Sequence, residues 1–479
     1  MTASWSMPPG RRRRSRRPTL VLGLAGIFTA SALAGWAIAD PGAFDAAVAG
    51  IARGALPTAS PGAPAVAPPA APDGGPGQPT PAAEATTPAP AASPVPASPT
   101  PAASPPAVPK ALAARLDRAL ARARERLLLP GVEATVLFPD GSTWTGALGS
   151  ADVATGRPVD ADTPFAIASV TKTFTTALVL RYAEQGRLRL DDRLASYLPD
   201  WPNARRITIR MLLGHTSGIP DFFANPKIDK VLQKDPGRAW TPTEILAYVP
   251  KGAVFPPGKG WAYSNTNFVL LGLVAEKVGG APWADLVRRE LIEPLGLTAT
   301  YVQGTRTPVV APAQAYRMIA GAAGPTPQAR GDGTDIVPFR SVVTAAGSAG
   351  SIASTTADLA RWARALYGGS AVLDLASRRA MLTCVKTYAY GTGTSYGLGV
   401  SRVSFDGHVA YGHTGALAGT RAAIRYFPKE KVAIAVAFNR ETFVGDDVVR
   451  ILARALFPAP PAAAPSPSPG TSAPPTSAP

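Results

Sequence analysis

The chain has 479 residues, 46% of them hydrophobic and 17% charged, and 48 Lys and Arg against 32 Asp and Glu give it a net charge of +16. Its single cysteine, Cys384, excludes an internal disulfide, a multi-thiolate zinc site and a CxxC redox pair. With three histidines in all, it offers little for a histidine-based metal cage, so we expect neither a metal nor a cofactor. The positive charge favours acidic partners. We find no basic helix with interleaved aromatic residues, however, and expect no nucleic-acid partner.

Residues 1–39 predict an export segment. Arginines at positions 11–14, 16 and 17 precede an apolar run, 19–39, that contains no charged residue. This order is typical of a signal peptide, and Ala37 and Ala39 supply small residues where a signal peptidase would cut. The run is also long enough to span a bilayer, which leaves an uncleaved membrane anchor as the alternative. Both alternatives make the catalytic domain extracytoplasmic, either secreted or anchored to the outer face of the cytoplasmic membrane.

Proline divides the remainder of the chain. Many of the 52 prolines lie between positions 57 and 109 or after position 457. Such segments cannot bury enough apolar surface to offset the entropy that is lost on ordering. We therefore expect a disordered Pro/Ala-rich linker at 40–109 and a disordered Pro/Ser/Ala-rich tail at 458–479. Residues 110–457 are enough to form one large core.

Within 110–457, the spacing of hydrophobic and turn residues predicts an α+β domain. In chain order, the domain is predicted to begin with a helix over 110–129 and a hairpin of strands over 132–137 and 143–148. A long helix-rich part follows, with a capping box at 241–244 and a helix over 265–278. Three strands, over 408–411, 420–427 and 432–438, and a closing helix over 444–457 complete the domain. Because strands lie at both ends around a helical insertion, we expect one sheet that is built from both termini.

Ser169 and Lys172 form the first candidate catalytic pair. Among the lysines of the chain, only Lys172 has a serine three positions before it, and an apolar helix follows. A three-residue step places both side chains on one face of a helix, so the ammonium can reach the hydroxyl. Serine is a weak nucleophile until a neighbouring base takes its proton. By itself the motif is weak, and a surface serine and lysine on a helix would be the favoured interpretation.

Two further segments could complete a site. Tyr263 stands two residues before Asn265 at the start of the helix predicted over 265–278, and a tyrosine hydroxyl beside a lysine can shuttle protons. The segment 413–415 is entered from the strand predicted over 408–411, and an edge strand beside the nucleophile can offer a backbone N–H to an oxyanion. In that segment, Gly415 would let a substrate backbone lie close, and His413 would add a partial positive charge.

Taken in order, Ser169-x-x-Lys172, Tyr263-x-Asn265 and His413-Thr414-Gly415 resemble the serine β-lactamase and penicillin-binding family, in particular its class C β-lactamase and D-alanyl-D-alanine carboxypeptidase branch. The resemblance spans about residues 110–457 and includes the segments 212–218, 350–355 and 396–399. It implies a β-lactamase/transpeptidase-like α+β fold, in which N- and C-terminal helices flank an antiparallel sheet and a mostly helical subdomain completes the domain.

The resemblance also implies roles for individual residues. Ser169 would be the acylated nucleophile, and Lys172 and Tyr263 would share general-base and general-acid work. Asn265 would hold the substrate amide, and backbone N–H groups of Ser169 and Ala416 would form the oxyanion hole. His413 and Thr414, beside Gly415, would contact the substrate carboxylate. If His413 does so through a positive charge, peptidase activity should weaken as pH rises through its pKa, which is ordinarily about 6.5.

Two other motifs are set aside. His215 lies in a second histidine motif, for which the family pattern implies a structural loop. Ser395 lies in a GxSxG sequence, 393–397, which matches the nucleophile elbow of α/β-hydrolases. That elbow needs a strand before it and a helix after it, and the residues that follow here start a helix poorly.

We therefore expect an exported serine hydrolase with an acyl-serine intermediate, in the first place a D-Ala-D-Ala carboxypeptidase-like peptidase on peptidoglycan stem peptides. Many class C β-lactamases have Lys where this chain has His413, which weighs against antibiotic hydrolysis. A β-lactamase or an esterase with the same machinery is the nearest alternative, and an inactive member that binds wall ligands is a second. The expected partner is a peptidoglycan-like peptide or a small acyl substrate, with 19–39 as a membrane anchor if it is not cleaved.

Overall fold

The computed structural model describes residues 105–321, 324–387, 394–442 and 444–457. The predicted export segment at 1–39, nearly all of the predicted linker at 40–109 and the predicted tail at 458–479 lie outside the described residues. Their boundaries and their roles therefore stay predictions. Among the residues that are described, no helix is long and apolar enough to cross a membrane.

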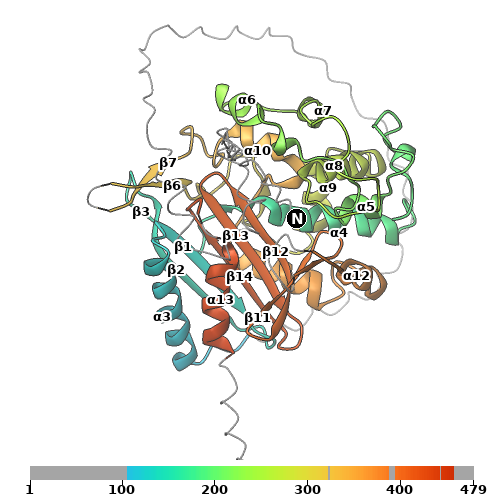
Figure 1. Ribbon diagram of the computed structural model, residues 1–479. Helices are drawn as coiled ribbons and strands as arrows, with labels where there is room; N and C mark the ends of the chain where they lie inside the picture. The colour runs from blue at the N-terminus through green and yellow to red at the C-terminus, as the bar shows by residue number, and fades with distance from the viewer. Residues whose placement is uncertain (1–104, 322–323, 388–393, 443, 458–479) are drawn as a thin grey trace, which may run out of the picture. The chain divides into compact units, whose positions relative to one another are not determined.

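A nine-stranded antiparallel sheet forms the framework of the described part, in the order β3-β2-β1-β14-β13-β12-β11-β10-β9 (Figure 1). Its strands are β1 (Gly131–Leu137), β2 (Thr143–Asp152), β3 (Arg157–Pro158), β9 (Val385–Lys386), β10 (Ser395–Tyr396), β11 (Ser401–Phe405), β12 (His408–Leu417), β13 (Thr420–Phe427) and β14 (Val432–Phe438). The two smaller sheets consist of β4 (Phe165–Ala166), β5 (Tyr301–Val302) and β8 (Ile352–Ser354), and of β6 (Tyr316–Ile319) and β7 (Thr326–Ala329). Because β1 pairs with β14, the two ends of the domain lie side by side, as predicted.

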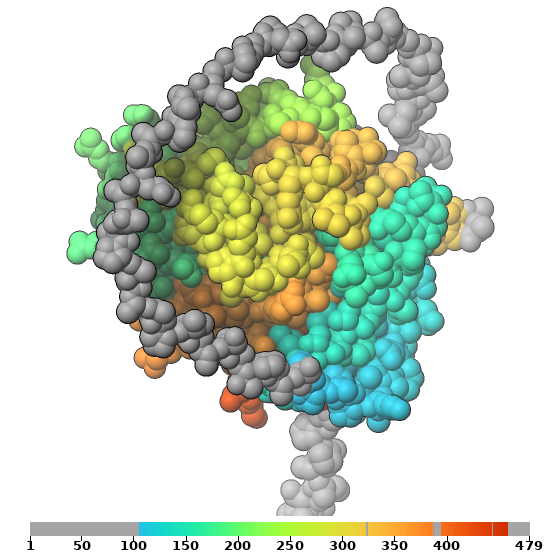
Figure 2. Space-filling model, turned by 180° about the vertical axis from the view of Figure 1, so that it is seen from behind, coloured from blue at the N-terminus to red at the C-terminus, as the bar shows by residue number. Residues whose placement is uncertain are grey.

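The helices fall into two groups. The terminal helices, α3 (Lys110–Arg126) and α13 (Gly445–Leu456), pack against each other on one face of the sheet (Figure 1). The others are α4 (Thr171–Glu184), α5 (Ile209–Leu213), α6 (Ile228–Lys234), α7 (Pro242–Leu246), α8 (Asn265–Gly279), α9 (Trp283–Val287), α10 (Arg340–Ala346), α11 (Thr356–Ala363) and α12 (Leu375–Leu382). Among these, α11 packs on β1, β13 and β14, and in the helical subdomain α4, α5, α7 and α9 pack against α8. Seen from behind, residues coloured green to yellow cover much of the molecule, with the blue and teal first helix and hairpin at its edge (Figure 2).

The predicted α+β architecture, with an antiparallel sheet, flanking terminal helices and a mostly helical subdomain, is confirmed. The strand predicted over 408–411 is longer than expected, because β12 pairs with β13 as far as Leu417. Residues 413–415 therefore belong to the strand itself. The first helix ends at Arg126, three residues early, since Leu128 adopts a left-handed φ of +48°.

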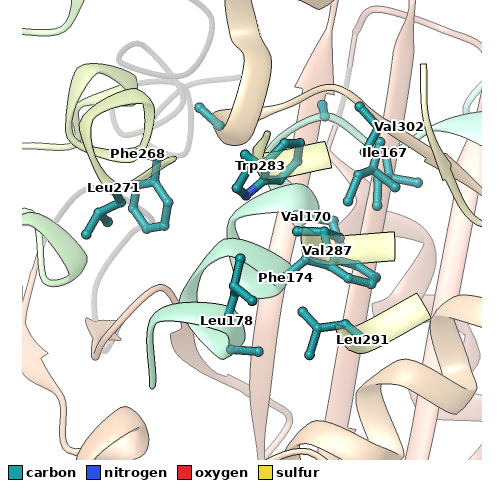
Figure 3. Packing of buried hydrophobic residues seen from close by; sticks show 14 of the residues in the cluster. Ile167, Val170, Phe174, Leu178, Phe268, Leu271, Trp283, Val287, Leu291 and Val302 are labelled. Carbon is teal, nitrogen blue, oxygen red and sulfur yellow. The ribbon is translucent and has the colours of Figure 1, made fainter. Parts of the chain in front are cut away.

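Helix α4 is the central element of the core that supports the site. All residues from 171 to 180 are buried, as expected for a helix that is surrounded on every side. Val170, Phe174 and Leu178 follow one another at four-residue steps and point into the same cluster as Val287 and Leu291 (Figure 3). On α11, the ring of Trp362 stacks on Phe174 at a centroid distance of 4.0 Å, and its Nε1–H donates to Thr173 Oγ1 at 2.8 Å. These contacts fix the helix that carries Lys172.

The packing of Phe174 leads to a stability prediction. Phe174→Ala should lower the free energy of unfolding by about 3–5 kcal/mol, because it opens a cavity beside Trp362. Val254 is 58% exposed, so Val254→Ala should change the free energy of unfolding by less than about 0.5 kcal/mol. Urea denaturation of the full chain measures both, and equal effects of the two substitutions would contradict this assignment of the core.

Candidate active site

Ser169 is the only partly exposed residue in a stretch, 163–180, that is otherwise buried. The chain leaves β4, turns at Ala168 and enters the 3-10 helix η1 (Ala168–Val170), which continues into α4. Ala168 has a φ of +48°, a strained value for a residue with a Cβ. Ser169 thus lies at the N-terminal start of a helical segment, where the helix dipole favours the negative charge of an alkoxide or an oxyanion.

The amine of Lys172 is buried and surrounded by three oxygen atoms. Its Nζ lies 3.0 Å from Ser169 Oγ, 2.7 Å from Asn265 Oδ1 and 2.8 Å from the Ala349 carbonyl oxygen. An ammonium can donate to all three. A neutral amine keeps two N–H groups, which the two obligate acceptors, Asn265 Oδ1 and the Ala349 carbonyl, can occupy. The lone pair then faces Ser169 Oγ and can accept its proton.

Burial lowers the pKa of Lys172 from 10.5 to about 7, while the nearby Asp221 carboxylate acts in the opposite direction. A general base is most effective when its pKa lies near the working pH, because it is then both deprotonated and basic. Lys172 meets this condition at neutral pH. The predicted pairing of Ser169 with a lysine base is thus supported by distance, burial and protonation state together.

The Ala349 carbonyl is held in place by α4 itself. Thr175 Oγ1 donates to the carbonyl of the preceding residue, Ser348, at 2.7 Å, and the Ile352 N–H donates to Thr171 Oγ1 at 3.1 Å. These bonds attach the segment 348–352 to the helix on either side of Ala349. The third acceptor of Lys172 therefore has a fixed position.

Tyr263 contacts the nucleophile directly: its hydroxyl donates to Ser169 Oγ at 2.9 Å. Its ring packs on His215 at a centroid distance of 4.4 Å, and His215 Nδ1 accepts from the N–H of Ser264 at 3.2 Å. Burial holds the pKa of His215 well below its ordinary value, so the ring is neutral. His215 thus supports the segment that carries Tyr263, in agreement with the structural role expected for it.

Asn265 connects Lys172 to a carboxylate. While its Oδ1 accepts from Lys172, its Nδ2 donates to Asp221 Oδ2 at 2.7 Å. Burial raises the pKa of Asp221, although part of the residue is exposed, and hydrogen bonds from the backbone and side chain of neighbouring residues oppose this rise. One N–H of the Asn265 amide is left for the predicted contact with a substrate amide.

Gly415 determines how closely β12 approaches the nucleophile. A Cβ at this position would lie 2.0 Å from the Ile167 carbonyl oxygen and 3.2 Å from the Cβ of Ala168. Gly415 thus allows the strand itself to lie against the turn before Ser169, and the predicted access for a substrate backbone stays a prediction. The adjoining residues of β12, Thr414 and Ala416, are partly exposed, and their predicted contacts with substrate stay predictions.

The expectation that His413 carries a positive charge is wrong. Burial is the main reason that its pKa falls to about 3, and the charge of Lys172 acts in the same direction. Its Nδ1 lies 2.5 Å from the Thr414 carbonyl oxygen, and its Nε2 lies 2.9 Å from the Tyr396 hydroxyl. The neutral tautomer with a proton on Nδ1 satisfies both contacts. His413 therefore offers no cation to a substrate carboxylate at neutral pH, and the activity should not weaken through loss of a proton from His413 as pH rises through 6.5.

Sequence reasoning missed three contributors to the site. Ala349 acts through its carbonyl oxygen, so its residue type gives no signal. Asp221 follows the quoted segment 212–218 by three positions, and an acidic residue in a polar loop is not distinctive without the fold. Tyr396 stands in the quoted segment 396–399, but its bond to His413 depends on tertiary structure.

The alternative serine is not in a nucleophile elbow. Ser395 lies on the short strand β10, which continues towards β11 rather than into a helix. Part of the GxSxG sequence falls at 388–393, outside the described residues. Within the described ranges, no group of three or more His, Cys, Asp and Glu side chains is placed to hold a metal ion.

Comparisons with known proteins relate the chain to one family and to several solved structures. The model of the Beta-lactamase family matches residues 116–458. Penicillin-binding protein 4 of Amycolatopsis lactamdurans is 31% identical over 331 residues, which are 65% of this chain and 81% of that protein. A D-aminopeptidase of Cereibacter sphaeroides is 28% identical over 71% of this chain and 63% of its own length. Among solved structures, the D-amino acid amidase of Ochrobactrum anthropi SV3 in complex with L-phenylalanine amide has a TM-score of 0.62 at 26% identity, over 72% of this chain and 97% of that chain.

The pKa of Lys172 leads to a pH prediction. The rate at which an electrophilic fluorophosphonate labels Ser169 should rise with a midpoint near pH 7 and fall about tenfold per pH unit below it, because the ammonium cannot accept a proton. Lys172→Met should slow labelling by roughly 10²–10⁴-fold and abolish this midpoint. A wild-type rate that does not change between pH 5 and 9 would exclude Lys172 as the base.

Gly415 provides a steric test. Gly415→Ala should lower the labelling rate by about 10²-fold or more, because its Cβ would displace β12 from the turn before Ser169. Gly237→Ala is the matched control, since a Cβ there meets only Asp235 Oδ1 at an ordinary 3.7 Å. Labelling kinetics and thermal melting of both variants separate a local effect from unfolding. Equal labelling rates would show that β12 does not need this approach.

Proposed function

The chain belongs to the Beta-lactamase family, that of the serine β-lactamases and penicillin-binding proteins, and from this premise we propose that it is an exported peptidase that acts through an acyl-Ser169 intermediate on D-Ala-D-Ala-like stem peptides. The observation that carries the catalytic part is the buried amine of Lys172, which lies 3.0 Å from Ser169 Oγ and is held by two obligate acceptors. This arrangement is what a nucleophilic serine requires.

The proposed reaction has two steps. In acylation, Ser169 Oγ attacks the carbonyl carbon as its proton passes to Lys172, and the bond from that carbon to the leaving group breaks. Tyr263, whose hydroxyl also contacts Ser169 Oγ, gives its proton to the leaving group and takes up the proton held by Lys172. In deacylation, a water molecule attacks the ester carbon and gives a proton to the same base. The bond from that carbon to Ser169 Oγ then breaks, and Oγ takes the proton back from the base, so that the acid and free Ser169 are released. The N–H groups of Ser169 and Ala416 are the proposed donors to the oxyanion.

The proposed substrate class has support from the relatives and from the sequence. A relative is named for penicillin binding, and penicillins mimic acyl-D-Ala-D-Ala, so a similar site is expected to accept such peptides. The predicted export segment at 1–39 and the Pro/Ala-rich stretch at 40–109 would suit work outside the cytoplasm, near peptidoglycan. Location and stem-peptide specificity are both parts of the proposal.

A second candidate follows from the neutral state of His413. A carboxypeptidase site must accommodate the terminal carboxylate of its substrate, and His413 supplies no positive charge for it. An enzyme that releases an uncharged group from a D-aminoacyl amide has no such need. Relatives of this chain include proteins named D-aminopeptidase and D-amino acid amidase, which fits this alternative.

A penicillin tests the acyl-enzyme. The full-length protein mixed with benzylpenicillin should gain the mass of the drug, and Ser169→Ala should not, because only the hydroxyl can form the ester. Intact-mass spectrometry measures both. Three results together would show an inactive family member: no adduct forms, the drug is not destroyed, and neither peptide nor ester substrates are cleaved.

A matched pair of peptides tests the leaving group. The proposed carboxypeptidase should release D-Ala from an acyl-D-Ala-D-Ala peptide faster than it releases D-alaninamide from the same peptide with an amidated C-terminus. The opposite order, by about tenfold or more, would favour the amidase candidate. A difference of this size is meaningful because one hydrogen bond to a charged group is worth roughly 1.5–3 kcal/mol. Liquid chromatography of the released amino acid distinguishes the two.

A further inference from the structure

We propose that Asp221 is a positioning residue for the catalytic base: by fixing which end of the Asn265 amide faces Lys172, it sets the direction in which the lone pair of Lys172 points. This inference rests on the proposed function, because it concerns the activation of Ser169. Asp221 itself is separated from Ser169 by Asn265 and Lys172, and we assign it no contact with substrate.

The turn that carries Asp221 is attached to the start of α8. The N–H of Phe222 donates to Thr266 Oγ1 at 2.9 Å, and that hydroxyl donates to the Pro220 carbonyl at 2.8 Å. Because Asn265 and Thr266 are consecutive residues of α8, these two bonds also fix Asp221 relative to Asn265. The carboxylate therefore has a defined position at the N-terminal end of a long helix, where the helix dipole favours a negative charge.

Both carboxylate oxygens of Asp221 accept hydrogen bonds. Oδ1 accepts from the N–H of Phe223 at 3.1 Å, and Oδ2 accepts from Nδ2 of Asn265 at 2.7 Å. An ionised carboxylate can only accept, so the Asn265 amide must turn its NH₂ group towards Asp221. Its oxygen then faces Lys172, where the Nζ–Oδ1 distance is 2.7 Å.

The orientation of this amide decides what the neutral amine of Lys172 can do. With Asn265 Oδ1 and the Ala349 carbonyl as acceptors, both N–H groups are used and the lone pair is left for Ser169. If the amide were reversed, its NH₂ group would face Lys172 and compete with the Ser169 hydroxyl for the lone pair. Asp221 thus acts on Ser169 through two intervening side chains.

Asp221 also supplies the negative charge that acts on Lys172. The other titratable groups around the amine are Tyr263, His215 and His413, and burial keeps both histidines neutral. Among the described residues, Asp221 is the charged group identified as raising the pKa of Lys172 against the effect of burial. Removing its charge should therefore lower the pH at which Lys172 loses its proton.

Asp221→Asn is the direct test. An asparagine has one acceptor oxygen where the carboxylate uses two, so either the bond from Phe223 or the orientation of Asn265 is lost. Fluorophosphonate labelling of Ser169 should slow by about tenfold or more, and the pH midpoint of the titration of Lys172 should fall by roughly one unit. The exposed Asp235→Asn is the control and should change neither quantity.

The double variant Asp221→Asn/Asn265→Asp reverses the pair. Its new carboxylate at 265 can accept from both Lys172 and the amide at 221, so the lone pair of the neutral amine again faces Ser169. We expect the labelling rate at high pH to recover towards that of the wild type. The midpoint should lie above that of the wild type, because the negative charge is now adjacent to the amine. A residue with only a structural role would give neither opposite shifts nor recovery.

The midpoint is measured without activity, by NMR titration of the full chain carrying ¹³Cε-labelled lysine, with the Lys172 signal assigned by its loss in Lys172→Met. Midpoints that are equal in the wild type, Asp221→Asn and the double variant would overturn the inference even if labelling slows. If the single variant fails to fold, the double variant alone tests the inference. A midpoint above that of the wild type would support it, and an equal midpoint would overturn it. Absence of labelling in the wild type would instead contradict the proposed function, and the titration would still decide on Asp221.

Discussion

The burial of one amine places the strongest constraint on this structure. A lysine side chain removed from water must have each of its N–H groups paired or lose its proton, and the surroundings of Lys172 allow both states. Three oxygens accept hydrogen bonds from the ammonium. Two of them, Asn265 Oδ1 and the Ala349 carbonyl, can only accept, and they bind both N–H groups of the neutral amine while its lone pair faces Ser169. The same burial that makes the residue costly to accommodate makes it a base at neutral pH.

This constraint explains why segments far apart in the chain meet here. Lys172 is supplied by α4, Asn265 by α8 and the Ala349 carbonyl by the segment before β8, and each is held by bonds to α4 or to the start of α8. The core under α4, with Trp362 stacked on Phe174, keeps the helix from moving relative to these partners (Figure 3). Positioning of this kind has to come from buried, well-packed elements, because an error of about 1 Å at the reacting atoms can cost 10²-fold in rate.

Local spacing predicted the parts of the site that depend on it. Ser169 and Lys172 share a helical face, and Tyr263 stands two residues before the helix that Asn265 begins, so the placement within each pair could be anticipated. The state of His413 could not, because it depends on burial and on a hydroxyl from β10 that becomes its neighbour only in the folded sheet. The close approach of Gly415 to the Ile167 carbonyl could not be predicted for a similar reason, since that turn is distant in the sequence. The alternation and turn signals gave the sheet and the hairpin, whereas pairing with β13 decided the true length of β12.

The distribution of charge around Ser169 also bears on what the site can recognise. Lys172 is occupied by three oxygens, His413 is neutral, and the Asp221 carboxylate is bonded to Asn265 and to the backbone. In the proposed site, the groups left to hold a substrate end at β12 are neutral donors such as the Thr414 hydroxyl and backbone N–H groups. Neutral donors bind carboxylates less strongly than a cation does, but they bind amide and ester carbonyls well. A single catalytic centre of this design can thus serve peptidase, amidase or esterase chemistry, with the choice made by the residues that contact the leaving group.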